Sequence, residues 1–218
     1  VTTSNRRLLL YDIDSLHQLP CEISASPSPA IIKRMTQKDA KIALQNLQTT
    51  KLSLFNSPTC MLPAKYSVTS QSIMIFFVGD DQGFIQAYQI IAPLRRKSPA
   101  YKIQCISKTQ MHNGSITQMS LIECYKCYAS SSADKTVKFW QFDEINKTFE
   151  ELRVLKDHSE ITAFKFCEKQ KTVITCGISR DAFVWSLSPP QRIFKLAGHY
   201  NTVLAITDYI TATNETYL

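Results

Sequence analysis

The stretch from residue 129 to residue 142, "ASSSADKTVKFWQF", decides the fold of this chain. It begins with small residues and reaches a polar turn at Asp134. From Thr136 to Trp140 the side chains alternate with a period of two residues, which a strand buried on one face requires. The stretch therefore predicts two short strands that are joined by a tight turn and end in an aromatic residue.

The same pattern recurs three more times along the chain. Each copy has small or polar residues, a turn and an alternating segment that ends in an aromatic side chain. The copies are "VTTSNRRLLLYDID" (1–14), "FVGDDQGFIQAYQI" (77–90) and "TCGISRDAFVWSLS" (175–188). Their aromatic residues, together with Trp140, are Tyr11, Tyr88 and Trp185, at intervals of 77, 52 and 45 residues. Such self-similarity indicates a repeat architecture.

A histidine recurs upstream of the later copies. The segments "MHNGSIT" (111–117), "DHSEIT" (157–162) and "GHYNTV" (198–203) each place a histidine shortly before a β-branched strand start. His112 lies 46 residues before His158, which lies 41 residues before His199. His112 precedes Trp140 by 28 residues, and His158 precedes Trp185 by 27. Two markers that stay in register indicate a single repeat of about 45 residues.

These markers resemble those of the WD-repeat family, whose unit of about 40–45 residues forms one four-stranded blade of a β-propeller. "AGHYNTV" (197–203) matches the Gly-His start of the unit, and "SSSADKTVKFWQF" (130–142) matches its second hairpin. The resemblance covers most of the chain and is weak from residue 14 to about residue 70. Among the aromatic residues only Tyr11 is followed by aspartate, and Gly-His occurs once. The resemblance implies an all-β fold, a β-propeller fragment of four-stranded antiparallel blades.

The repeat divides the chain into six segments. They are the end of a first blade (1–24), an insertion with a helix (25–59), a degenerate blade (60–110), the best-matched blade (111–156), a further blade (157–197) and the start of another (198–218). In the two best blades we expect strands at 116–122, 127–132, 135–142 and 149–155, and at 161–167, 172–177, 182–187 and 191–196. About three units cannot close a ring, since propellers have about 4–8 blades, so we expect a piece of a longer propeller.

The insertion contains a helical pattern and a basic cluster. In "TQKDAKIALQNLQ" (36–48), Thr36 and Asp39 resemble a capping box, and the apolar residues share one helical face. The segment is either a solvated surface helix or a docking element, and the same alternatives apply to "PLRRKSPAYK" (93–102). The candidate partner-binding residues are Lys33, Arg34, Lys38, Lys41, Arg95, Arg96 and Lys97.

The best-matched blade contains a group that resembles an active site: His112, Ser130, Asp134 and Trp140. A serine, a histidine and an aspartate together suggest a hydrolase. The resemblance to WD repeats implies a structural tetrad instead, in which the indole donates to the serine, the serine to the histidine, and the aspartate holds the other ring nitrogen. Because the chain has no G-x-S-x-G motif, we favour the structural interpretation and predict no catalytic residues.

The next blade carries a partial copy of the tetrad. When Trp185 is aligned with Trp140, Thr175 and Ser179 take the positions of Ser130 and Asp134, and we expect His158 to be the histidine of this copy. Ser179 replaces the carboxylate, although Asp181 follows two residues later. A graded series of copies is typical of a structural element, because a catalytic triad would not be repeated in decaying form.

No pattern in the sequence predicts a cofactor or a metal. Cys124-x-x-Cys127 is the one cysteine pair with ligand spacing, and a zinc site needs four ligands, usually from a second pair or from histidines. Phosphate-binding glycine motifs are missing from the sequence. The cysteines are best interpreted as small apolar residues in a reducing compartment.

The charge of the chain bears on its partners. With 25 Lys and Arg against 18 Asp and Glu, the formal net charge is +7, which suits partners with an acidic surface. No apolar run is long enough to cross a bilayer and the first residues are not a signal peptide, so we expect a cytoplasmic protein without membrane contact. Nucleic acid is disfavoured because interleaved aromatic residues for base stacking are missing.

We expect rigid blades that hold variable loops. This architecture indicates a non-catalytic scaffold for protein–protein interactions within a large assembly. The irregular spacing and the phrases "YDIDSLHQL", "GDDQGFIQAYQI" and "NETYL" resemble the large WD-repeat proteins of cilia and flagella. That resemblance implies axonemal partners such as tubulin, whose acidic tails suit a basic chain. The alternative is a WD-repeat subunit of a soluble complex, such as a ubiquitin-ligase receptor or an RNA-processing machine.

Overall fold

The structure is a computed structural model that describes two compact units. Backbone and side chains are described for residues 56–65, 74–91 and 103–207, and the backbone alone for residues 2–3, 7–8, 21–23, 52–53, 73, 101–102, 209–210 and 216–217. The first unit comprises residues 1–58, 63–78 and 86–108, and the second comprises residues 59–62, 79–85 and 109–218.

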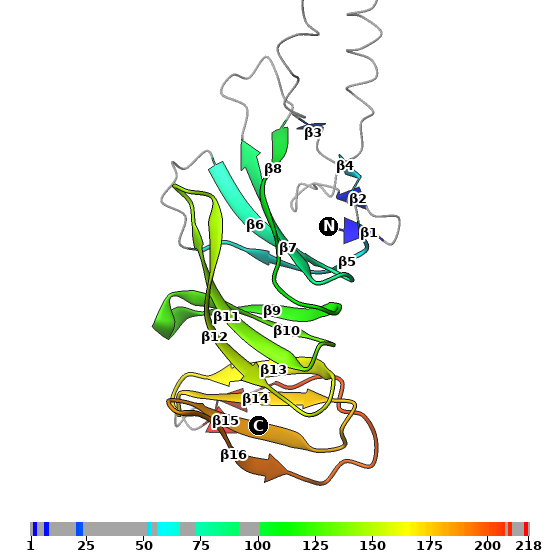
Figure 1. The fold of residues 1–218 in the computed structure, drawn as a ribbon, viewed down its shortest axis with the longest axis vertical. Coiled ribbons are helices and arrows are strands. Elements are labelled where there is room, and N and C mark those ends of the chain that lie inside the picture. Colours follow the sequence, from blue (N-terminus) through cyan, green and yellow to red (C-terminus); the bar gives the residue numbers. More distant parts are fainter. Residues whose placement is uncertain are drawn as a thin grey trace, which may run out of the picture. The chain divides into compact units, whose positions relative to one another are not determined.

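The second unit contains two four-stranded antiparallel sheets (Figure 1). The first sheet has the order β12-β11-β10-β9. Its strands are β9 (Ile116–Ile122), β10 (Cys127–Ser132), β11 (Thr136–Asp143) and β12 (Thr148–Lys156). The expected strands at 116–122 and 127–132 are confirmed to the residue, and the other two are shifted or extended by one residue at their ends. Between β9 and β10, the 3-10 turn η2 (Glu123–Tyr125) ends at Lys126, which has a left-handed φ of 50°.

The second sheet has the order β13-β14-β15-β16. Its strands are β13 (Ile161–Cys167), β14 (Thr172–Gly177), β15 (Ala182–Leu187) and β16 (Pro190–Leu196). The first three agree with the expected ranges, and β16 begins one residue earlier than expected. In β11, the buried Val137 and Phe139 alternate with the less buried Thr136 and Lys138 as expected, whereas all six residues of β10 are buried. Beyond them, β17 (Tyr209–Ile210) pairs with β18 (Thr216–Tyr217).

A single hydrophobic core joins the two sheets face to face (Figure 1). From the first sheet, Val137 and Phe139 of β11 are 0% and 3% exposed, and they meet Phe164 and Trp185 of the second. Each large apolar side chain that leaves water in this way contributes about 1.5–3 kcal/mol to folding. Packing the two sheets together therefore stabilises both of them.

The first unit supplies most of a five-stranded sheet with the order β3-β8-β7-β6-β5. Its strands are β3 (Cys21–Ile23), β5 (Pro58–Pro63), β6 (Ile73–Asp80), β7 (Phe84–Ile91) and β8 (Tyr101–Gln110). The sequence did not predict β3, which pairs with β8 in parallel and adds a fifth strand to the degenerate blade. A smaller sheet joins β1 (Thr2–Thr3), β2 (Arg7–Leu8) and β4 (Leu52–Ser53).

Some of the sequence predictions fall outside the described residues. They include the helix expected at 36–48 and all seven basic candidates for partner binding, at 33–41 and 95–97. Within the described part of the chain, none of the helices has the length and apolar character that a membrane crossing requires.

Candidate functional site

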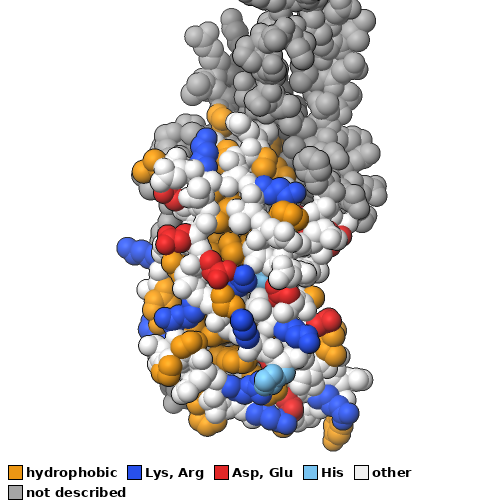
Figure 2. Space-filling model, viewed as in Figure 1, with side chains coloured by type: hydrophobic (Ala, Val, Ile, Leu, Met, Phe, Trp, Pro, Cys, Tyr) orange, Lys and Arg blue, Asp and Glu red, His pale blue; other side chains and the backbone are white. Residues whose placement is uncertain are grey.

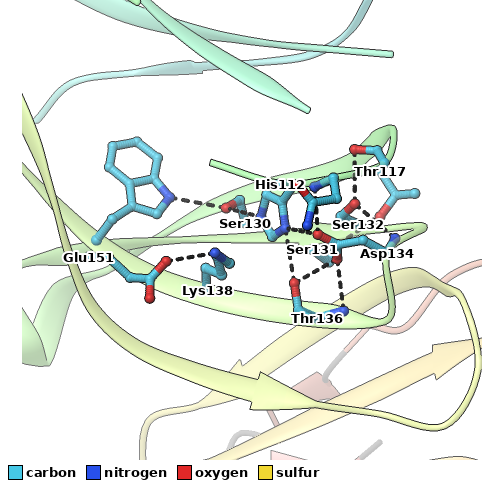
Figure 3. A network of polar contacts seen from close by, with 12 residues as sticks. His112, Thr117, Ser130, Ser131, Ser132, Asp134, Thr136, Lys138 and Glu151 are labelled. Carbon is cyan, nitrogen blue, oxygen red and sulfur yellow. Dashed lines mark hydrogen bonds and ion pairs between the residues drawn. The ribbon is translucent and has the colours of Figure 1, made fainter. Parts of the chain in front are cut away.

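The structure brings the four side chains of the expected tetrad together in the first sheet of the second unit (Figure 3). Ser130 on β10 and Trp140 on β11 lie diagonally across the hairpin, and the indole Nε1 donates to Ser130 Oγ at 3.1 Å. His112, in the loop before β9, places Nε2 2.8 Å from the same oxygen. On the other side of the ring, Nδ1 lies 3.0 Å from Asp134 Oδ2.

Asp134 accepts more bonds than the tetrad alone provides. Its Oδ1 accepts from the backbone N–H of Thr136 at 3.0 Å and from the Thr136 hydroxyl at 2.6 Å, while Oδ2 also accepts from the backbone N–H of Asn113 at 3.0 Å. Burial would raise the pKa of the Asp134 carboxyl, but the bonds from His112, Thr136 and Asn113 outweigh it and hold that pKa well below its usual range. An ionised Asp134 fixes the tautomer of His112, because Nδ1 must then be the donor and Nε2 the acceptor of the Ser130 hydroxyl.

These bonds tie the loop before β9 to the turn between β10 and β11. Ser132 Oγ donates to the carbonyl of Gly114 at 3.0 Å and accepts from the backbone N–H of Asp134 at 3.0 Å. The loop is held from its other side by Gly83, whose carbonyl accepts the backbone N–H groups of Met111 and His112, both at 3.0 Å. Gly83 has a φ of 85°, and a Cβ there would lie 2.1 Å from the carbonyl oxygen of His112. Only glycine fits this position.

The environment of Ser130 excludes nucleophilic chemistry on an external substrate. Ser130 and Trp140 are fully buried, and His112 is 1% exposed. The oxygen of Ser130 already accepts the indole N–H while its own hydrogen is committed to His112. Every buried side-chain nitrogen and oxygen among the described residues has a partner. The group is therefore a satisfied polar network inside the blade, which stabilises a fold and specifies its packing.

The second sheet carries a shorter version of the network. Trp185 Nε1 donates to Thr175 Oγ1 at 2.9 Å, and the Thr175 hydroxyl donates to Asp157 Oδ2 at 2.8 Å. Asp157 Oδ1 faces the guanidinium of Arg192 at 3.5 Å, and the side chain of Asp157 is 3% exposed. Arg192 also lies over the ring of Phe183, 3.9 Å from its centroid. A carboxylate thus occupies the position that a histidine holds in the first sheet.

The expected roles of His158 and Ser179 are not what the structure shows. His158 is exposed, and its backbone N–H donates to Asp157 Oδ1 at 2.7 Å. Ser179 Oγ accepts the backbone N–H of Asp181 within its own turn, and Asp181 pairs with Lys195 at 2.6 Å. The reason is the position of each residue in its loop. The inward-facing residue lies four positions before the strand, which is His112 before β9 but Asp157 before β13.

Sequence reasoning therefore missed two members of these networks, Asp157 and Thr136. A signal for Asp157 was available, because it precedes Trp185 by the same 28 residues that separate His112 from Trp140, whereas His158 is one residue short. A signal for Thr136 was the Asp-x-Thr spacing, in which an aspartate accepts a backbone N–H two residues later.

In the third aligned copy, the positions that correspond to Ser130 and Asp134 hold Val78 and Gln82. The phenol of Tyr88 donates to Gln86 Oε1 at 2.7 Å, and Asp80 Oδ1 accepts two backbone N–H groups of its own turn. This copy is held by a local turn and a Tyr–Gln bond.

The remaining candidate sites are the cysteine pair and the charged surface. Cys124 is exposed and Cys127 is buried, and burial raises the pKa of the Cys127 thiol to about 11, which makes it a poor nucleophile. Groups of three or more metal-binding side chains are missing from the described part of the chain. On the face shown in Figure 2, lysine and arginine side chains are spread among hydrophobic ones.

Comparison with known proteins finds similarity to one family of repeats and to one propeller fold. The family described as "WD domain, G-beta repeat" matches residues 103–141 and 149–186. A search of curated proteins found no match. Among solved structures, the chain is similar to the WD40 β-propeller domain of Doa1, with 14% sequence identity and a TM-score of 0.54. The similarity covers 76% of this chain and 49% of that domain, so the chain spans about half of its length. Residues 103–141 and 149–186 therefore match WD repeats, and the four-stranded sheets have the fold of WD40 propeller blades.

Proposed function

We propose that this chain is a non-catalytic scaffold that holds other proteins together in a large assembly. One observation carries the proposal: the group that most resembles a catalytic triad is buried, and its polar atoms are bonded to one another. Its rigid blades leave the surface side chains and loops free to differ from one repeat to the next, and such surfaces are where partners bind.

The surface of the second unit supports a role in binding. Several large hydrophobic side chains are exposed on it, among them Phe194 at 64%, Tyr200 at 92% and Leu204 at 74%. Contiguous apolar patches are typical of interaction sites, and these side chains are the candidates for such a patch.

Our more specific proposal is an axonemal, microtubule-associated complex. The net charge of +7 supports it, since acidic tubulin tails would be attracted to a basic chain. The basic residues at 33–41 and 95–97 are the candidates for that contact. The rival proposal, a subunit of a soluble complex in the cytoplasm, shares the scaffold role and differs in the partner.

Co-sedimentation of the full chain with microtubules over a salt series tests the axonemal proposal. We expect binding at low salt that weakens as salt is added, because salt screens exposed charges over about 10 Å at 0.1 M. Microtubules treated with subtilisin, which removes the acidic tails, are the matched control and should bind less. If the chain stays in the supernatant at low salt, the axonemal proposal is wrong, and the soluble complex becomes the better interpretation.

A further inference from the structure

An open pocket of about 340 Å³ lies between the two sheets of the second unit. Its apolar walls come from both sheets, since Cys127 and Phe139 belong to β10 and β11, and Leu187 ends β15. These three residues are members of the shared core, so the pocket is an unfilled end of that core. We call it the inter-sheet pocket.

The sheets contact each other closely through their inner strands, where β13 meets β9 and β10. The pocket is lined instead from the outer strand β12, by Leu152 and Arg153, and from the η2 turn, by Tyr125. The pocket therefore lies away from the strands through which the two sheets are in closest contact. The described residues of both sheets supply these walls.

The rim of the pocket combines exposed apolar groups with positive charge. Tyr125 is 44% exposed and Leu152 is 46% exposed. The guanidinium of Arg153 donates to the carbonyl oxygen of Leu187, which leaves further N–H donors in the fixed fork of this group. The ammonium of Lys171 lies 5.7 Å from the centroid of the Tyr125 ring.

One carboxylate close to the rim in sequence is paired. Glu151, which precedes Leu152 on β12, pairs with the ammonium of Lys138 at 2.7 Å. None of the described residues that line the pocket is acidic. An approaching partner therefore meets an apolar hollow beside Arg153 and Lys171.

We propose that the inter-sheet pocket binds an acidic segment of a partner protein, which inserts one bulky hydrophobic side chain between the sheets. This inference rests on the proposed scaffold function and names the chemistry of one partner. The volume is at the lower end of the range of about 300–1,000 Å³ for ligand pockets, and it suits an anchoring side chain. Tyrosine and arginine beside an apolar hollow are the residue types that dominate binding energy at protein interfaces.

Selection of peptides on the full chain tests the proposal. A phage library of random peptides is selected on the immobilised protein, and the enriched peptides are made with a fluorescent label. We expect them to share a bulky apolar residue next to aspartate or glutamate. Their binding, measured by fluorescence anisotropy, should weaken as salt is added, because part of the attraction is electrostatic.

Two variants locate the binding, and a third is the control. Leu152→Glu places a negative charge at the rim, which repels the acidic residues of the peptide, and should weaken binding about tenfold or more. Arg153→Gln removes a positive charge and should weaken binding less. Ile178→Glu makes the same kind of change at a residue that is 56% exposed in the turn after β14, at the opposite end of the second sheet, and should leave binding unchanged. Leu152 is exposed, so its variant should unfold at the same urea concentration as the natural chain.

The outcomes are distinct. Peptides that bind all variants equally would place the site elsewhere, which overturns the pocket and leaves the scaffold function standing. Pocket-dependent peptides without acidic residues overturn the proposed partner chemistry. A screen that yields no peptide, while indole or another aromatic fragment shifts the NMR signals of Leu152 and Leu187, shows a small-molecule site and also overturns the proposal. Microtubule co-sedimentation decides the axonemal function separately.

Discussion

At the scale of single residues, the chemistry of this chain lies in polar side chains that satisfy one another inside the blades. Ser130 is the centre of the better network, since it accepts from Trp140 and donates to His112. Ser130→Ala would leave a buried indole N–H and a buried ring nitrogen without partners. We expect a loss of about 2–4 kcal/mol in the free energy of unfolding, measured by urea denaturation. Ser120→Ala, which removes a long 3.4 Å bond to Leu121, is the control and should cost under about 0.5 kcal/mol.

The Ser130→Ala variant also distinguishes a structural network from an active site. If the chain had a hydrolase activity that was lost in Ser130→Ala with the stability unchanged, Ser130 would be a nucleophile and the structural interpretation would be wrong. If Ser130→Ala lowers the stability and no such activity is found, the structural interpretation is supported.

The exchange of a histidine for an aspartate in the second sheet gives a second prediction. Asp157→Ala removes the acceptor of the Thr175 hydroxyl and the partner of Arg192. We expect it to lower the free energy of unfolding by about 2–4 kcal/mol. His158→Ala is the adjacent control, and since His158 is exposed it should cost under about 0.5 kcal/mol. A larger effect at His158 than at Asp157 would contradict the register that we describe.

The Asp134 carboxyl makes the stability of the first sheet depend on pH. Its pKa is held below the usual value of about 3.9, so the folded state binds its proton less readily than the unfolded state. Its contribution is therefore complete above about pH 4 and is lost as the pH falls further. We expect Asp134→Asn to be less stable than the natural chain near neutral pH, with a difference that shrinks below about pH 4. Urea denaturation of both proteins at several pH values measures it, and a difference that does not change with pH would refute it.

At the scale of elements, the sheets are held by the turns that enter and leave their strands. The hairpin turn at Gly83 contacts the loop before β9 so closely that a Cβ has no room. Gly83→Ala adds both a steric clash with the His112 carbonyl and a strained left-handed backbone. We expect a loss of about 2–4 kcal/mol in the free energy of unfolding, and a shift of the His112 ring signals in NMR spectra.

Gln82→Ala in the same turn is the control for Gly83. Gln82 is exposed and contributes its backbone N–H to Asp80, which alanine retains. Its free energy of unfolding should stay within about 0.5 kcal/mol of the natural value. Equal effects of the two substitutions would mean that the close approach at Gly83 is not what stabilises the loop.

At the scale of the second unit, one core makes the two sheets a single cooperative structure. The chain has 2 tryptophans, Trp140 in the first sheet and Trp185 in the second, so each reports on one sheet. With 5-fluorotryptophan in both positions, we expect the two ¹⁹F signals of the folded state to disappear at the same urea concentration. Their assignment follows from Trp140→Phe. Separate transitions would show that each sheet folds alone and that the shared core contributes little.

The sequence by itself determined the strands of the second unit. The alternation from Thr136 to Trp140 and the markers at His112 and Trp140 place the strands of the first sheet within one residue. This succeeded because a strand that is buried on one face needs an apolar residue at every second position, which is a local property. The grouping of His112 with Ser130, Asp134 and Trp140 followed from the family resemblance, and the structure brings these residues together.

Only the tertiary structure decided which loop residue faces inward, which strand pairs with which, and where the sheets separate. Asp157 replaces His158 because the inward-facing position lies four residues before the strand, and His158 lies only three residues before β13. The parallel pairing of β3 with β8 joins segments far apart in the sequence. The inter-sheet pocket exists because two sheets that meet at their inner strands diverge toward the outer ones. Each of these depends on contacts between distant parts of the chain, which no local pattern records.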